Sequence, residues 1–375
     1  MSFKTKQEVD NSKLSGPLRS MRVVEIGSIG PAPFAAMMLA DMGADVIRVE
    51  RHDPGPIVER GPTVRGRRTV CADLKDPSDK TTVQDLIDQC DVLIEGFRPG
   101  AMERLGLGPE TVLSRNPRLV YARMTGWGQD GPLSQTAGHD INYISLSGAL
   151  HAMGSIEQPP PVPLNLVGDY GGGALYLVSG ILAAYIEAQS SGSGQVVDVA
   201  ICDASVSLMS LFHQLQEEGE WLPQRHANQL DGAAPFYRTY ACKDGRYLAV
   251  GALEPQFYAI VRKLAGWDDA CFDRQYDRSR WPEMSKRAEK IMQSRTRDEW
   301  VSLFAGTDAC VSPVLDLQES RNHPHLQSRG CMVQVGEQLQ PAPAPRFSRT
   351  PSNARASVSL GDVKEINALW SKEEV

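Results

Sequence analysis

Two segments that are dense in polar residues and lie in glycine-rich surroundings contain side chains that can transfer protons. Residues 138–143 contain His139, and residues 165–173 contain Asp169 shortly before three glycines. Both segments are typical of turns that lead into helices, so we expect Asp169 at or near a helix N-terminus, where backbone amides stabilise negative charge. Taken singly, Asp169 is typical of a helix cap and His139 of a hydrogen-bonded core histidine. Together they indicate proton removal next to a carbonyl group.

Glu254 is a third candidate for this chemistry. It follows a predicted strand and stands at the start of a predicted helix, where an acidic residue is common for local reasons alone. A carboxylate that reached His139 would orient the imidazole ring and favour its protonated form.

Basic residues follow several predicted strands and indicate an anionic ligand. Arg51 comes directly after one strand, Arg98 comes shortly after another, and Lys75 and Arg104 lie in nearby loops. Ligands of open α/β sheets collect beyond the carboxyl ends of the strands, and arginine suits phosphate groups. Each residue taken alone is typical of a solvated surface.

The N-terminal region has only a superficial similarity to a dinucleotide-binding motif. A strand, a glycine turn, a helix and a second strand ending in Glu50 follow one another. The turn 27–31 lacks the three-glycine spacing, and Pro31 has no amide hydrogen for a phosphate. We therefore do not expect nicotinamide binding.

The elements that would position these residues alternate between strand and helix, which predicts an α/β fold with a large open Rossmann-like domain. Expected strands cover 21–26, 45–50, 91–95, 119–124 and 195–200. Expected helices run to residue 42 and cover about 82–89, 109–114, 172–187 and 203–216.

A smaller α+β domain is expected after residue 220. Strands 235–240 and 247–251 flank a turn, helices follow near 256–264, 284–293 and 298–304, and 310–315 is strand-like. The predicted organisation is a large domain at 1–220, a small domain at 221–335, and a C-terminal segment at 336–375 that returns to the large domain, with an extended proline-rich connector at 341–345.

Composition excludes several classes of protein. The chain has 375 residues, of which 41% are hydrophobic and 23% charged, as in globular proteins with a large core. The net charge of -7 argues against a general nucleic-acid binder. We see no apolar run long enough to span a membrane, no hydrophobic signal region in 1–15 and no peroxisomal tripeptide at the end, so we expect a cytoplasmic protein.

Several strings of this sequence resemble the alpha-methylacyl-CoA racemases of the family III CoA-transferase (CaiB/BaiF-like) superfamily. The resemblance runs from about Leu18 to Ser348. It is carried by the strings at 39–50, 121–129, 138–143, 163–173, 251–258 and 307–311.

This resemblance assigns roles to residues of the chain. It implies that His139 and Asp169 are the two catalytic bases, that Glu254 pairs with the histidine, and that the protein is an interlocked homodimer. Residues implied to contact CoA or the thioester are Arg51, Cys71, Ala72, Asp73, Leu74, Lys75, Arg98, Arg104, Met124, Gly138, Asp140, Ile141, Asn142 and Tyr143.

The activity implied is an isomerase that epimerises the C2 centre of 2-methylacyl-CoA thioesters. One base removes the alpha proton, backbone amides near Asp169 hold the enolate, and the other residue reprotonates the opposite face. No metal or redox cofactor is expected, since CoA is part of the substrate. The alternatives are a CoA-transferase with Asp169 as nucleophile, which would not need His139, and a non-catalytic CoA-binding protein. Candidate acyl contacts are Met153, Leu208 and Met209.

Overall fold

The computed structural model describes residues 14–53, 61–363 and 370. The chain forms two compact units. The larger comprises Met1–Ser147, Pro163–Leu208 and Pro324–Val375, and the smaller comprises Gly148–Val162 and Met209–His323. These units group residues differently from the expected ranges 1–220, 221–335 and 336–375. The chain enters the smaller unit first at Gly148 and again at Met209, and it returns to the larger unit at Pro163 and at Pro324.

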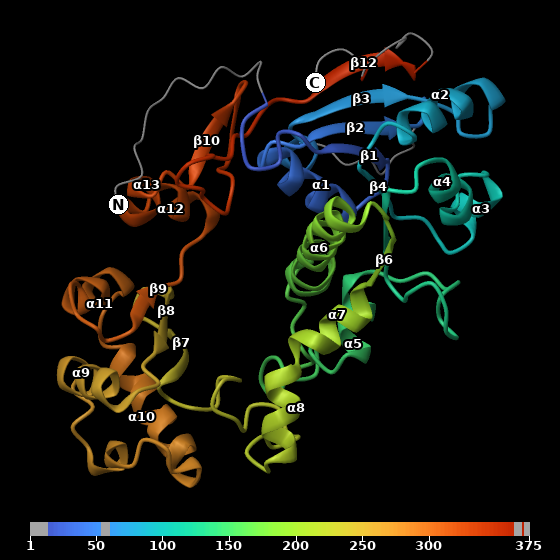
Figure 1. Cartoon of the computed structure of the whole chain (residues 1–375). Coiled ribbons are helices and arrows are strands. Elements are labelled where there is room, and N and C mark those ends of the chain that lie inside the picture. The colour runs from blue at the N-terminus through green and yellow to red at the C-terminus, as the bar shows by residue number, and fades with distance from the viewer. Residues whose placement is uncertain (1–13, 54–60, 364–369, 371–375) are drawn as a thin grey trace. The chain divides into compact units, whose positions relative to one another are not determined.

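The larger unit is built on a seven-stranded sheet in the order β12-β3-β2-β1-β4-β5-β6, and every neighbouring pair in it is parallel (Figure 1). The strands are β1 (Arg22–Ile26), β2 (Asp45–Glu50), β3 (Arg67–Cys71), β4 (Val92–Glu95), β5 (Val120–Thr125), β6 (Val196–Ala200) and β12 (Val358–Asp362). All carboxyl ends therefore meet at one edge of the sheet. This confirms the predicted open α/β architecture.

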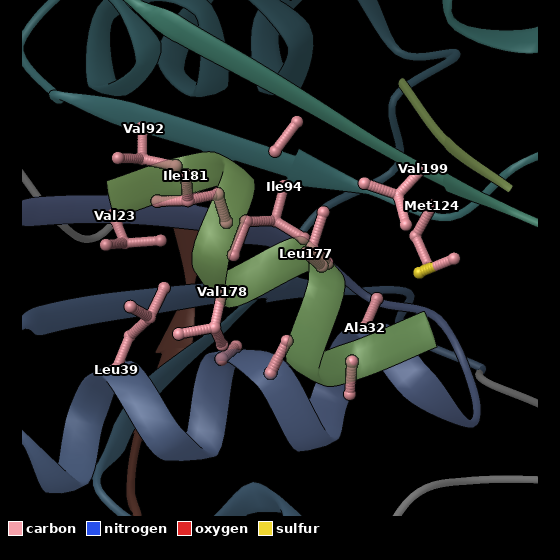
Figure 2. Packing of buried hydrophobic residues seen from close by; sticks show 14 of the residues in the cluster. Val23, Ala32, Leu39, Val92, Ile94, Met124, Leu177, Val178, Ile181 and Val199 are labelled. Atoms are coloured by element: carbon pink, nitrogen blue, oxygen red, sulfur yellow. The ribbon is translucent and has the colours of Figure 1, made fainter. Parts of the chain in front are cut away.

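Helices cover both faces of this sheet because its strands are apolar on both sides. On one face, Val23 and Ile94 pack with Leu39 of α1 (Pro31–Asp41) and with Leu177 and Ile181 of α6 (Leu175–Ser191), as Figure 2 shows. The opposite face packs against helices α2 (Pro77–Ile87), α3 (Ala101–Arg104) and α4 (Pro109–Arg115). Fully covered parallel sheets show this pattern.

The remaining elements of the larger unit connect or extend this layered core. They are a 3₁₀ turn (Gly61–Val64), α5 (Asp140–Leu146), the π-helix η2 (Leu166–Ala174) that continues into α6, α7 (Ile201–Leu208), α13 (Pro324–Ser328) and the hairpin of β10 (Met332–Val335) and β11 (Gln338–Pro341).

The helical segment Leu166–Ser191 is long and apolar enough to cross a membrane, judged by length and composition only. The expectation that no such run exists was therefore wrong. Part of its apolar surface belongs to the protein core, because Leu177, Val178 and Ile181 pack between the sheet and α1 (Figure 2). The two chain ends that informed the expected cytoplasmic location lie mostly outside the described residues. That location stays a prediction, which cell fractionation would test.

The smaller unit has an antiparallel sheet of β7 (Tyr237–Ala241), β8 (Tyr247–Gly251) and β9 (Val311–Pro313). Its helices are α8 (Ser210–Glu217), α9 (Pro255–Ala265), α10 (Trp281–Met292), α11 (Arg297–Phe304) and α12 (Leu317–Asn322). Trp267 and Trp300 are buried in its own core. This agrees with the predicted α+β organisation.

Candidate active site

A cavity of about 440 Å³ opens at the carboxyl edge of the large sheet. We call it the chemical cavity. Both His139 and Asp169 line it. Its other lining residues come from the β1–α1 turn and the start of α1, the ends of β4 and β5, the loop before α5, α5 itself, and α7: Ile29, Gly30, Pro31, Ala32, Gly96, Phe97, Arg98, Pro99, Met124, Thr125, Gly126, Trp127, Ser134, Thr136, Ala137, Gly138, Tyr143 and Ile201.

The start of α5 fixes the backbone of His139. His139 is the N-cap residue, and its extended backbone lets its carbonyl oxygen accept hydrogen bonds from the amides of Asn142 and Tyr143 at 2.8 and 3.3 Å. In return, the His139 amide donates to Oδ1 of Asn142 at 3.0 Å. This reciprocal arrangement satisfies groups that a helix end leaves without intrahelical partners.

Tyr143 supports the same turn from behind. Its hydroxyl donates a hydrogen bond to the carbonyl oxygen of Gly138, and its ring meets Trp127 edge-on at 4.7 Å. A Cβ atom on Gly126 would collide with the tyrosine ring, so this close approach requires glycine. Burial, with a contribution from the Asp169 carboxylate, raises the pKa of Tyr143 to about 12. The hydroxyl therefore remains a donor at neutral pH.

Asp169 lies in the first turn of η2, which agrees with its predicted place near a helix N-terminus. Its Oδ2 accepts a hydrogen bond from the side-chain amide of Asn165 at 3.4 Å. Gly30 of the β1–α1 turn is close to the same oxygen, because a Cβ atom at this glycine would lie 3.3 Å from it. The next residue, Tyr170, stacks on Phe34 of α1 at 4.2 Å. π-Helical turns recur at functional sites.

The backbone amide of Asp169 is used by a neighbouring side chain. It donates to Oδ2 of Asp140 at 2.6 Å. The amides near Asp169 that are expected to hold an enolate therefore do not include this one, and their role stays a prediction.

A second cavity of about 260 Å³ lies beyond the ends of β1, β2 and β3. We call it the handle cavity. Arg51 and Lys75 contribute basic side chains to it, and the loop that contains Lys75 is held by a hydrogen bond from the Asp73 amide to Asp79 at 2.8 Å. The lining residues are Ile26, Gly27, Val49, Glu50, Arg51, Ala72, Asp73, Leu74, Lys75, Phe97 and Leu105. Phe97 lines both cavities, so the two are neighbours.

The predicted contact residues divide into three groups. Arg51 and residues 72–75 line the handle cavity, whereas Arg98, Met124, Gly138 and Tyr143 line the chemical cavity. A third group lines neither of them: Cys71, Arg104, Asp140, Ile141 and Asn142. Glu254 belongs to the smaller unit, where it is the N-cap of α9, and its pairing with His139 stays a prediction.

Sequence reasoning missed the aromatic residues Phe97 and Trp127. Each follows the carboxyl end of a parallel strand, β4 and β5 respectively, and this position could have identified them. The Phe97 amide donates to Oε2 of the buried Glu95 at 2.7 Å, while Oε1 of Glu95 accepts from Nε of Arg123 at 3.0 Å. The wall shared by the two cavities is thus anchored to a buried ion pair.

A second buried ionic group supports the β1–α1 turn and was also missed. Glu25 accepts hydrogen bonds from Arg48 and Arg67. Arg48 also donates to the carbonyl oxygen of Ser28 at 3.1 Å, and Arg67 donates to that of Pro33. These contacts hold both ends of the turn that forms one wall of the chemical cavity.

Comparison with known proteins agrees with the fold. Residues 18–361 match CoA-transferase family III. Alpha-methylacyl-CoA racemase from Mus musculus is 44% identical over 92% of this chain and 91% of its own length. The corresponding figures for alpha-methylacyl-CoA racemase from Homo sapiens are 42%, 89% and 87%. A CaiB/BaiF family protein from Brucella suis has the same fold, with a TM-score of 0.77 and 24% identity over 91% of this chain and 95% of its own.

Proposed function

Because this chain belongs to CoA-transferase family III, we propose that it is an isomerase that racemises the C2 centre of 2-methylacyl-CoA thioesters. The mouse and human relatives carry this activity in their names. The observation that carries the proposal is that His139 and Asp169 line one cavity, although they belong to separate helical segments. A racemase requires such a pair, since protons must leave and return on opposite faces of one carbon.

In this mechanism one of the two residues takes the alpha proton, and the electrons of the broken C–H bond move into the thioester carbonyl to form an enolate. The other residue then donates a proton to the opposite face of the alpha carbon. Backbone amides near Asp169 are proposed to donate hydrogen bonds to the enolate oxygen.

The CoA part of the substrate serves as a binding handle. The handle cavity, with Arg51 and Lys75, suits the phosphate-rich end of CoA. The chemical cavity, which shares Phe97 with it, suits the thioester. Binding energy from the distant end of the molecule would then position the reacting carbon. The proposed reaction uses no cofactor besides the CoA that the substrate carries.

A homodimer is part of the same proposal. Helical segments of the larger unit carry large apolar side chains on their exposed surface, among them Leu146, Leu166 and Ile186, which are 64%, 56% and 66% exposed. Exposed apolar surface of this kind is typical of subunit interfaces. Sedimentation equilibrium at micromolar concentration should give twice the chain mass of 41.1 kDa. A monomer would contradict this part of the proposal.

A CoA-transferase would require different catalytic residues in this cavity than a racemase. A CoA-transferase would use Asp169 as a nucleophile and has no need of a second proton-transfer residue beside it. His139 on the wall of the same cavity therefore favours the racemase.

Glu254 is proposed to orient His139, as a carboxylate does in other enzymes that pair an acid with a histidine.

Deuterium exchange tests the proposed function. The purified protein is incubated with one epimer of a 2-methylacyl-CoA in deuterated water, and both the configuration and the mass at the alpha carbon are followed. We expect a mixture of epimers with deuterium at that carbon and no requirement for an acceptor acid. Absence of exchange, or CoA transfer to an added carboxylate without exchange, would reject the racemase.

A further inference from the structure

A buried carboxylate connects the two segments that carry the proposed bases. Asp140 is the first residue of α5, adjacent to His139, and its side chain is buried. Its Oδ2 accepts the hydrogen bond from the Asp169 amide at 2.6 Å. The Gly168 amide is also hydrogen-bonded to this carboxylate. The neighbour of one base thus holds the backbone of the other.

Glycine at position 168 makes this contact possible. A Cβ atom there would lie 2.6 Å from Oδ2 of Asp140 and 3.1 Å from Oδ1. The first of these distances is shorter than atoms tolerate, so any side chain at 168 would push the carboxylate away from the two amides. The turn before Asp169 is therefore shaped to receive Asp140.

This contact is not an ordinary local helix cap. The carboxylate and the amide that it accepts are 29 residues apart in the chain. The residue in the local capping position of η2 is Asn165, and its side chain makes no capping hydrogen bond. Asp140 therefore replaces the local cap with a contact between two segments.

The arrangement is also unfavourable to the carboxylate itself. Burial raises the pKa of Asp140, and the amides of Asp169 and Gly168 only partly oppose this effect. Within the part of the chain that the structure describes, Oδ1 is buried and has no hydrogen-bond partner. A buried carboxylate with half of its acceptors unused is a costly way to join two segments, which suggests a role beyond stability.

We propose that Asp140 is a positioning residue that sets the spacing between His139 and Asp169. The inference rests on the proposed function, because spacing matters only if both residues act on one carbon. The side chain itself lines neither cavity, in contrast to the substrate contact implied by the sequence. Its loss should slow proton transfer on both faces of the substrate, whereas loss of one base should affect mainly one face.

The test measures deuterium uptake from each epimer separately in Asp140→Ala, Gly168→Ala and the double variant. A displacement of about 1 Å costs a rate on the order of 10²-fold, so we expect Asp140→Ala to lower kcat by about that factor for both epimers. KM should change less than about twofold, since substrate binding is retained. The double variant should be no slower than the slower single variant, because both changes break one contact.

Asp231→Ala is the matched control. This carboxylate accepts hydrogen bonds from the amides of Ala227 and Ala233 in the smaller unit, so its loss should lower the Tm without changing either exchange rate. Asp140→Asn keeps the side-chain volume and should lose about tenfold in kcat, because its neutral amide oxygen is a weaker acceptor than the carboxylate. It provides the test if the alanine variant does not fold.

Three outcomes would overturn the role of Asp140: a wild-type rate in folded Asp140→Ala or Asp140→Asn, loss for one epimer only, or additive effects in the double variant. Failure of the proposed function would appear differently, as absence of exchange in the wild-type protein.

Discussion

The chemical cavity and the handle cavity share one sheet edge and one side chain, Phe97, but are constructed differently. The handle cavity is made largely by residues that directly follow neighbouring strands. Glu50 of β2 is in register with Cys71 of β3, so Arg51 and Ala72 emerge side by side. The candidate bases of the chemical cavity instead come from α5 and η2, which lie outside the sheet.

This difference separates binding from chemistry. Strand register places Arg51, and a short loop after β3 places Lys75. An exposed cation tolerates small displacements because its attraction to phosphate falls slowly with distance. Proton transfer requires much closer placement. The chemical cavity accordingly depends on side-chain contacts with the backbone, both local, as between Tyr143 and Gly138, and non-local, as between Asp140 and Asp169. Substitutions in the chemical cavity should therefore lower kcat, whereas substitutions in the handle cavity should raise KM.

The largest effect is expected from the proposed bases. Asp169→Asn removes a proton acceptor but keeps the shape of the side chain, so kcat should fall by about 10³-fold while KM changes less than about threefold. His139→Ala should suppress exchange mainly from one face of the substrate. Both are measured by deuterium uptake from each epimer.

The control for this prediction is Asp91→Asn. Asp91 is partly buried at the opposite, amino edge of the sheet, where it accepts the Arg22 amide at 2.7 Å. The Asp91→Asn variant should change the Tm but not kcat. Equal kcat values for Asp169→Asn and the wild type would remove the distinction between the cavities.

An intermediate effect is expected from Tyr143→Phe, which deletes the hydrogen bond behind His139. A hydrogen bond of about 1 kcal/mol corresponds to roughly a fivefold loss, so we expect kcat to fall by about that factor with little change in KM. Since the raised pKa of Tyr143 is about 12, its hydroxyl remains protonated as pH rises toward that value. The ratio of wild-type to variant kcat should thus stay constant from pH 6 to about pH 10.

Tyr121→Phe is the matched control, because the Tyr121 hydroxyl donates to the carbonyl oxygen of Leu107 at 3.0 Å within the opposite core. Tyr121→Phe should lower the stability of the protein and leave kcat unchanged. If both variants lowered kcat equally, the contact with Gly138 would have no special role.

The smallest effect is expected from Arg51→Ala and Lys75→Ala in the handle cavity. An exposed charge interaction of at most about 1 kcal/mol should raise KM by up to roughly fivefold and leave kcat within about twofold. The increase should shrink in high salt, because salt screens exposed charges. Arg115→Ala, at a surface ion pair with Asp88, serves as the control and should leave KM unchanged. A fall in kcat with unchanged KM would contradict a handle role.

Strands with a clear apolar pattern were predictable, whereas strands rich in polar residues were not. The five expected strands of the large sheet are present as β1, β2, β4, β5 and β6. β3 was missed because it begins with Arg67 and Arg68, and Arg67 is buried only because Glu25 accepts its hydrogen bond. β12 was missed because it is mostly exposed and lacks an apolar pattern, and because it pairs with β3 from the far end of the chain.

By itself, the sequence determined the alternating elements, the family motifs and the residues that follow each strand, because periodicity and local turn chemistry are properties of neighbouring residues. Only the tertiary structure decided that His139 and Asp169 share a cavity, that Phe97 lines both cavities, and that Asp140 accepts the hydrogen bond of the Asp169 amide. These contacts join residues far apart in the chain, and packing to within a fraction of an ångström decides which donor meets which acceptor.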